Sequence, residues 1–175
     1  MFPLIILAVL VTVWLLWLPY LAKTTKHGAP FVPTEPDIVN RIMELAGVGE
    51  KDTFFDLGSG DGRLVIAAAR RGAQSIGIEI DPIKVFLVRV RLRFLHLQNA
   101  RIIHANLFEV DLSPATVVIS YLLPPAQKKL KSKLEKELQP GTRVVAVAFP
   151  IPGWTPTKTD PHGTQYGPLY LYITK

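Results

Sequence analysis

Apolar and polar positions along residues 35–175 follow two alternating patterns, which together predict an α/β fold. Short apolar runs bounded by glycine, proline or charged residues are typical of buried strands, whereas longer runs with start and stop residues are typical of helices. The expected strands are 52–57, 75–80, 100–105, 115–122 and 142–149. The expected helices are 35–45, 62–72, 81–99 and 124–138.

The segment 81–99 carries both patterns at once. Every second residue from Phe86 to Phe94 is apolar, as in a strand. The segment nevertheless starts with an acid followed by a proline, which is a good helix start, and its apolar run is long for a strand. We therefore predict a helix. One face of it carries Arg89, Arg93 and His96.

Strands that alternate with helices indicate a parallel sheet with helices on both faces. The residues after Trp154 instead resemble an antiparallel hairpin with a loose turn at 160–163. We thus predict a Rossmann-like, mostly parallel sheet with a C-terminal antiparallel hairpin. It is a compact version, because no crossover helix fits between Phe149 and Trp154. Thr34 is expected to cap the first helix, which Gly47 ends.

Residues 1–22 carry no charged side chain and are long enough for roughly 30 Å of helix. A secretory signal peptide would need a basic start and a shorter apolar run, so a retained transmembrane anchor is favoured. Two tryptophans and a tyrosine near its C-terminal end, followed at once by Lys23 and Lys26, are typical of a membrane interface. The lysines predict a single-pass protein whose globular part faces the cytoplasm, or the matrix in a mitochondrion. Residues 23–34 form a short, stiff, proline-rich linker.

Composition narrows the chemistry in two ways. The chain has no cysteine, which excludes disulfides, thiolate nucleophiles and cysteine metal sites. Its net charge of +6 lies wholly after residue 22. That charge suits an anionic partner such as a membrane surface, a nucleic acid or an acidic protein, although it also serves plain solubility.

The stretch "TFFDLGSGDGRL", residues 53–64, holds the candidate chemistry. Its glycines stand at alternate positions, so the third comes one place too early for the dinucleotide fingerprint G-x-G-x-x-G, and Arg63 stands in its place. Carboxylates at Asp56 and Asp61 would also bring negative charge to a pyrophosphate site. No Gly-Lys-Ser/Thr follows, which excludes a P-loop.

A cationic ligand without phosphate makes the opposite demand, and S-adenosylmethionine is such a ligand. Asp56 can accept hydrogen bonds from its amino group, while Gly58 and Gly60 let the backbone approach. Glu79 ends the second strand and is placed to hold both ribose hydroxyls. Asn106, just after the third strand, can reach the adenine edge. We therefore predict S-adenosylmethionine as the cofactor.

Four stretches resemble one family: "PFVPTEPDIVNRI", "DLGSGDGRLVIAAARRG", "GIEIDP" and "RVVAVAFPIPGWTP". They are similar to the membrane-anchored protein-lysine methyltransferases of the mitochondrial inner membrane, which act on the ATP synthase c subunit and the adenine nucleotide translocase, and to a soluble archaeal relative. The resemblance implies a class I methyltransferase domain at 35–175. It also implies that Thr34, Asp61 and Ile80 complete the cofactor site. Asn106 stands where these enzymes often have an acid, and "YLLPP" matches them only loosely.

The acceptor is the least determined part. Tyr121, at the end of the fourth strand, is a candidate to line the acceptor channel and accept a hydrogen bond from an amine. Three hypotheses stay open: a membrane-anchored protein-lysine methyltransferase, which the resemblance favours, an enzyme acting on a quinone or phospholipid, and a non-catalytic membrane adaptor. No metal is expected, because the histidines lack ligand spacing. No nucleic acid is expected either, because Leu122 and Leu123 precede the proline pair instead of an Asp/Asn.

Overall fold

The computed structural model describes residues 11–12 and 32–175 of the chain. Apart from residues 11 and 12, the predicted transmembrane helix at 1–22 lies outside these residues, as does most of the linker at 23–34. Among the helices that are described, none has the length and the apolar character needed to cross a membrane.

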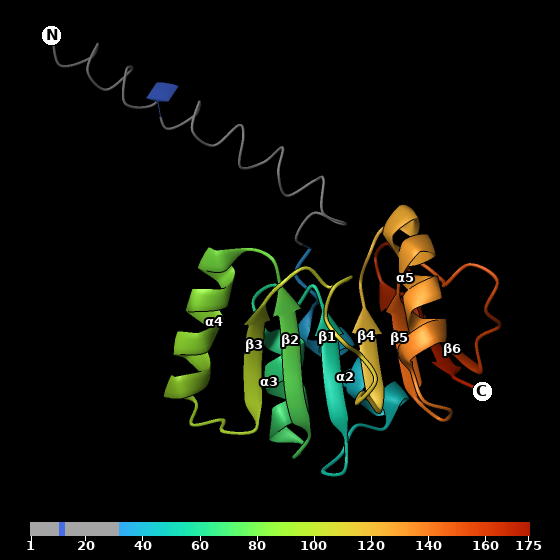
Figure 1. The fold of residues 1–175 in the computed structure, drawn as a ribbon, viewed down its shortest axis with the longest axis horizontal. Coiled ribbons are helices and arrows are strands. Elements are labelled where there is room, and N and C mark those ends of the chain that lie inside the picture. The colour runs from blue at the N-terminus through green and yellow to red at the C-terminus, as the bar shows by residue number, and fades with distance from the viewer. Residues whose placement is uncertain (1–10, 13–31) are drawn as a thin grey trace, which may run out of the picture. The chain divides into compact units, whose positions relative to one another are not determined.

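Residues 32–175 form a seven-stranded sheet with strand order β3-β2-β1-β4-β5-β7-β6 (Figure 1). All pairs from β3 to β5 are parallel, and β7 pairs antiparallel with both β5 and β6. The strands are β1 (Thr53–Leu57), β2 (Gln74–Glu79), β3 (Ala100–His104), β4 (Val117–Ser120), β5 (Arg143–Val147), β6 (Lys158–Thr164) and β7 (Gly167–Ile173). The helices are α2 (Pro36–Ala46), α3 (Arg63–Arg70), α4 (Pro82–Phe94) and α5 (Pro124–Glu137). The predicted mostly parallel fold and its C-terminal hairpin are confirmed.

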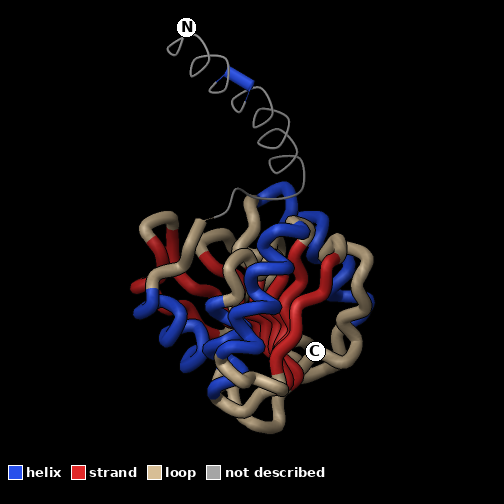
Figure 2. Tube along the Cα trace, turned by 90° about the vertical axis from the view of Figure 1, so that its left-hand side faces the viewer, coloured by secondary structure: helices blue, strands red, loops and turns tan. Residues whose placement is uncertain are grey.

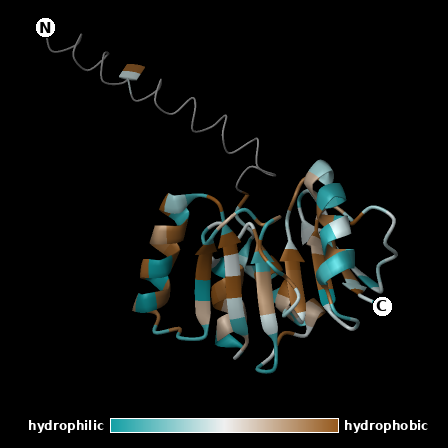
Figure 3. Cartoon of the chain, in the orientation of Figure 1, coloured by the Kyte–Doolittle hydropathy of each residue, from teal (hydrophilic) through white to brown (hydrophobic). Residues whose placement is uncertain are grey.

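Helices cover both faces of the twisted sheet, as predicted (Figure 2). Phe54 of β1 points toward α2 and α3, while its neighbour Phe55 points to the opposite face, where α5 packs. The strands are mostly apolar because both faces are buried (Figure 3). Neither the connection from β3 to β4 nor that from β5 to β6 contains a helix, so the second face is covered by α5 and by loops. This is the compact version of the architecture that the short connection after Phe149 predicted.

Two local predictions are wrong. Thr34 does not cap α2: the cap position is Glu35, no side chain caps the helix, and Thr34 is buried one residue earlier. The turn of the hairpin does not lie at 160–163 either, because these residues belong to β6 and the chain reverses between Thr164 and Gly167. The proline and glycine in 160–163 are instead accommodated by an irregularity of register in an edge strand, where a missing backbone donor is tolerated.

The ambiguous segment 81–99 is helical, as predicted, but the helix α4 ends at Phe94, earlier than expected. Asp81 caps it by accepting hydrogen bonds from the backbone N–H groups of Ile83 at 2.9 Å and Lys84 at 3.4 Å. Pro82 occupies the first turn, where its missing N–H costs nothing. The N-terminal end of α4 is therefore fixed directly after β2.

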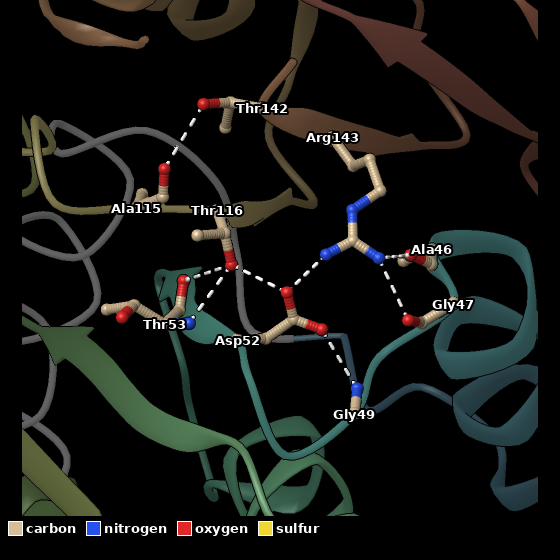
Figure 4. A network of polar contacts seen from close by, with 9 residues as sticks. All are labelled: Ala46, Gly47, Gly49, Asp52, Thr53, Ala115, Thr116, Thr142 and Arg143. Atoms are coloured by element: carbon tan, nitrogen blue, oxygen red, sulfur yellow. Dashed lines mark hydrogen bonds and ion pairs between the residues drawn. The ribbon is translucent and has the colours of Figure 1, made fainter. Parts of the chain in front are cut away.

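A polar network ties the N-terminal ends of the strands together (Figure 4). The Asp52 carboxylate accepts hydrogen bonds from the Thr116 hydroxyl at 2.7 Å and the Gly49 N–H at 2.9 Å, and it forms an ion pair with Arg143. The Arg143 guanidinium also donates to the carbonyls that end α2, those of Ala46 and Gly47. The Asp52–Arg143 ion pair and its hydrogen bonds thus join α2, β1 and β5 at the N-terminal ends of the strands, at the opposite end of the sheet from the glycine loop.

Candidate functional site

The glycine loop turns sharply between the end of β1 and the start of α3. Gly58, Gly60 and Gly62 all have positive φ, at 88°, 54° and 74°. The Gly58 N–H donates to the Ile78 carbonyl of β2 at 2.9 Å, which fixes the loop on the neighbouring strand. At Gly62 a Cβ atom would lie 2.4 Å from a Val88 methyl group, so this glycine also permits close packing of the loop on α4.

Asp56 lies in β1, two residues before Gly58, with almost no solvent contact, at 4% exposed. None of the described residues provides a hydrogen-bond donor to its carboxylate. Burial raises the pKa of Asp56 to about 8, and the charges of Glu79 and Asp61 add to the rise. A buried acid without a donor is costly unless a cationic or donating ligand completes it, so Asp56 marks a ligand site.

Glu79 lies at the end of β2, as predicted, and its carboxylate is held from two sides. One oxygen accepts from the Gly60 N–H at 2.8 Å, and the other accepts from the Asp81 N–H at 2.9 Å. A carboxylate has about four acceptor positions, so each oxygen retains one for a ligand hydroxyl. The orientation of Glu79 is therefore set before any ligand binds.

Asp61 is paired with an arginine in the structure, and its role in the cofactor site stays a prediction. Its carboxylate forms an ion pair with Arg63, whose Nε lies 2.9 Å from one Asp61 oxygen. Burial alone would raise the pKa of Asp61, but the hydrogen bonds and charge of Arg63 outweigh it and hold the pKa below its usual value. Arg63 also donates to the Thr34 carbonyl and so joins the segment before α2 to the glycine loop. In the sequence Arg63 stood out only as a departure from the dinucleotide fingerprint, although its place two residues after an acid was a signal for this role.

Ile80 and Asn106 follow the ends of β2 and β3. Ile80 is 39% exposed, and its carbonyl lies 3.0 Å from Nε2 of His104. The Asn106 side chain is engaged within its own turn, where it donates to Glu109 at 2.9 Å and accepts from the Phe108 N–H at 3.2 Å. The strand ends place both residues on the predicted edge, but the contact of Asn106 with adenine and the role of Ile80 in the cofactor site stay predictions.

Tyr121 begins the segment after β4, half-buried, and its hydroxyl lies 3.4 Å from the Thr164 hydroxyl of β6. Gln127 of α5 is fully buried, and its side-chain amide donates to residues at the ends of two strands. One is the Ser120 hydroxyl of β4, at 3.1 Å, and the other is the Phe149 carbonyl after β5, at 3.2 Å. Gln127 therefore couples the end of β4 to the end of β5. The sequence did not predict this role, since a glutamine in a lysine-rich helix gives no signal.

The backbone reverses at the end of β5 in an uncommon conformation. Ala148 has a φ of 64°, and the Phe149 N–H donates to the Val147 carbonyl at 2.8 Å, which describes a γ-turn around Ala148. Gly167 makes room for it, because a Cβ at that position would lie 2.5 Å from the Ala148 oxygen. Strained backbone of this kind is concentrated at functional sites. Here it directs Phe149 and Pro150 along the same edge as Tyr121.

The residues at this edge fit S-adenosylmethionine. Asp56 offers a buried carboxylate for an ammonium group, and Glu79 offers two oriented acceptors for a diol. Gly58 leaves open space, because a Cβ atom at this position would have only a Leu122 methyl group within 4 Å. In the described part of the chain, no group of three or more histidines and carboxylates could hold a metal ion.

Replacing Glu79 by alanine is expected to weaken cofactor binding by about 1.5–3 kcal/mol, because charge-assisted hydrogen bonds to the ligand are lost. Titration calorimetry of the full chain in detergent measures the change. Glu44→Ala removes an exposed carboxylate near the C-terminal end of α2, away from the glycine loop, and it serves as the control. Equal losses in both variants would contradict a specific role for Glu79.

The chain matches known proteins over most of its length. The family described as "ANTKMT methyltransferase domain" matches residues 56–158. A protein-lysine N-methyltransferase from Saccharolobus islandicus is 40% identical over 154 residues, which cover 82% of this chain and 92% of that protein. The lysine N-methyltransferase of the ATP synthase c subunit from Rattus norvegicus is 34% identical over 157 residues, which cover 88% of this chain and 72% of that protein.

Solved structures agree with these matches. An RNA methyltransferase from Salinibacter ruber in complex with S-adenosyl-L-homocysteine is 42% identical, with a TM-score of 0.76 over 81% of this chain and 93% of that one. A putative methyltransferase from Escherichia coli shares the fold, with a TM-score of 0.70 at 20% identity, over 83% of this chain and 89% of that one. Together with the glycine turn between Asp56 and Glu79, these similarities show that the chain belongs to the ANTKMT methyltransferase domain family and is an S-adenosylmethionine-dependent methyltransferase.

Proposed function

We propose that this enzyme methylates the ε-amine of lysine in a protein at or in a membrane. The observation that carries the lysine assignment is the 40% identity to a protein-lysine N-methyltransferase over nearly the whole of that protein. The membrane assignment is supported by the uncharged residues 1–22 and by the basic character of the rest of the chain. We further propose a single-pass topology with the enzyme domain on the cytoplasmic or matrix side, which follows from Lys23 and Lys26.

The residues after β4 suit an amine acceptor. When bound, the cofactor supplies a methyl group that its sulfonium already activates, so the protein mainly has to position the two reactants. A lysine amine, with a pKa near 10.4 in water, must first become neutral. Leu123, which is 39% exposed, provides an apolar surface that would lower the pKa of such an amine by desolvation, while Leu122 is buried in the core beneath it. The Tyr121 hydroxyl can accept a hydrogen bond from it and orient the lone pair.

Two other classes of methyl acceptor have to be distinguished from a protein lysine. The 42% identical relative is described as an RNA methyltransferase, and the anchor would also suit an enzyme that methylates a quinone or a phospholipid. The segment Leu122–Ala126 argues against an exocyclic base amine, because it lacks the polar residue before the proline pair and the aromatic one after it. Asp56 and Glu79 argue against a non-catalytic adaptor, since an unused pocket would not need a buried, donor-free carboxylate.

The function is tested by mass spectrometry of cells with and without the gene, complemented by wild type or by Asp56→Asn. We expect a membrane-protein lysine whose 14-dalton increments disappear in both the deletion and the Asp56→Asn strain. If protein lysines are unchanged while a methylated lipid, quinone or RNA base is lost, the acceptor is a different one and the lysine proposal fails.

Tyr121→Phe is expected to lower the initial rate of methyl transfer into membranes of the deletion strain by roughly tenfold, which corresponds to about 1.4 kcal/mol. Cofactor affinity should stay unchanged, because Tyr121 lies at the acceptor side of the site. Tyr166→Phe, in the exposed turn of the hairpin, is the matched control. A full rate in Tyr121→Phe would leave the tyrosine as a packing residue only.

A further inference from the structure

Helix α4 has apolar side chains on the face that points away from the protein. Val85, Val88 and Leu92 form its buried face. The opposite face carries five of the ten large hydrophobic side chains that are exposed among the described residues. They are Ile83 (60% exposed), Phe86 (65%), Leu87 (59%), Val90 (36%) and Phe94 (81%).

These five residues form one continuous stripe along the helix, which we call the outer stripe. At 100° per residue, positions 83, 86, 87, 90 and 94 fall on one side of a helix, centred opposite the buried face. With a rise of 1.5 Å per residue, the stripe extends over roughly 17 Å from Ile83 to Phe94. Hydrophobic segments recur along α4 in Figure 3, at the left end of the sheet. Singly exposed apolar residues need no explanation, but a contiguous stripe of this length indicates a binding surface.

Cations border the outer stripe on both sides. The same helical spacing places Lys84 and Arg91 along one flank and Arg89 and Arg93 along the other, and α4 contains no acidic residue. Two of the arginines are also bonded to backbone carbonyls, Arg89 to Ile102 at 2.9 Å and Arg91 to Asp61 at 3.4 Å. These bonds hold the guanidinium groups beside the stripe. Arg91 also interacts with the charge of the Asp61 carboxylate, and Lys84 forms an ion pair with Asp81 at 3.8 Å, so the flank of Arg89 and Arg93 is the one that no described acid pairs with.

We propose that the outer stripe of α4 lies on the surface of a bilayer that contains anionic lipids. A helix with a large apolar face and flanking cations is the form that binds in the interfacial plane, where the side chains enter the acyl boundary and the cations meet lipid phosphates. This surface is distinct from the anchor at 1–22, and it does not depend on which acceptor the enzyme uses.

The flanking cations favour a bilayer over two other partners that could cover the outer stripe. Residues 1–22 of the same chain would cover an apolar stripe, but they offer no acid to four flanking cations. A second copy that paired α4 with α4 symmetrically would place these cations opposite the same cations, which is unfavourable. Anionic headgroups satisfy both the stripe and its flanks.

Docking by α4 would bring the cofactor site near the headgroups. Glu79 holds the Asp81 N–H, and Asp81 caps α4, so only Ile80 separates the ribose-binding carboxylate from the cap of the docked helix. The bilayer would therefore set the orientation of the active-site edge as well as its distance from the membrane.

The absence of cysteine allows a direct test with the full chain. Leu87→Cys on the stripe and Ser132→Cys on the exposed side of α5 are each labelled with a polarity-sensitive fluorophore and reconstituted into phosphatidylcholine vesicles with or without phosphatidylglycerol. We expect the label at 87 to become several-fold brighter, and to be quenched by spin-labelled lipids, mainly in the anionic vesicles. The label at 132 should stay in water. Arg93→Glu should reduce the quenching at 87 several-fold, and Lys136→Glu on α5 should not.

The other occupants give different results, and each overturns the proposal. A label at 87 that is already shielded in dilute, lipid-free protein shows that the chain covers its own stripe. Shielding that rises with protein concentration shows a second copy. A label that stays in water in both kinds of vesicle shows that α4 does not meet the bilayer.

Discussion

Without ligand, the Asp56→Asn variant is expected to melt at a higher temperature than the wild-type protein at pH 8 and above. It is also expected to bind S-adenosylmethionine on the order of 100-fold more weakly than the wild type does. The reason is that burial raises the pKa of Asp56 to about 8 in the unligated protein. The folded protein thus holds a proton that the unfolded chain releases near pH 3.8. The stability that Asp56 contributes is full below that pH, and it is lost as the pH rises toward 8.

The size of the stability difference follows from the shift. One pKa unit corresponds to about 1.4 kcal/mol, so Asp56→Asn should gain on the order of 2 kcal/mol or more at pH 9 and little at pH 5. Thermal melts at both pH values measure it. In a domain of this size each kcal/mol corresponds to roughly 3 °C.

The proton on Asp56 should also affect cofactor binding. At pH 7 the wild-type Asp56 is mostly protonated, and an ammonium ligand requires the carboxylate, so binding should release about one proton. The dependence of the calorimetric heat on the ionisation enthalpy of the buffer counts that proton, and any residual binding by Asp56→Asn should release none. A variant that melts like the wild type at every pH, and binds the cofactor equally well, would remove Asp56 from the site.

Arg143→Ala is expected to lower the free energy of unfolding by about 3 kcal/mol without changing cofactor affinity. Removing the guanidinium leaves the Asp52 carboxylate, whose side chain is 9% exposed, without its ion-pair partner and leaves two carbonyls at the end of α2 without donors. Urea unfolding measures the loss. Arg101→Ala, on the exposed side of β3, should change stability by less than about 0.5 kcal/mol. Similar losses in both variants would show that the Asp52 network adds nothing specific.

The order of the elements and the cofactor carboxylates could be predicted because local signals determine them. Buried strands in a parallel sheet read as apolar runs, and the acids and glycines at their ends mark the ligand edge. The alternation in 81–99 that resembled a strand has a physical cause. Because α4 is apolar on its buried face and on its outer stripe, its hydrophobic residues recur more often than one face of a helix requires.

The remaining features depend on contacts between segments far apart in the sequence. Thr34 had the right residue type for a cap, but Arg63, 29 residues later, holds its carbonyl instead. Gln127 gives no local signal, since only the fold places it between the ends of β4 and β5. The hairpin turn was misplaced because an edge strand tolerates a Pro and a Gly that usually mark a turn.

The bond from Arg63 to the Thr34 carbonyl has a consequence for how far the enzyme can reach. It fixes the start of the catalytic domain beside the glycine loop, so the chain enters the domain at the rim of the active site. Between residue 22 and Thr34 the backbone can extend over roughly 40 Å at most. With the membrane anchor that we propose for residues 1–22, this length would limit how far the active site reaches from its point of attachment. Lengthening the segment would then enlarge the set of lysines within range, and shortening it would exclude the distant ones first.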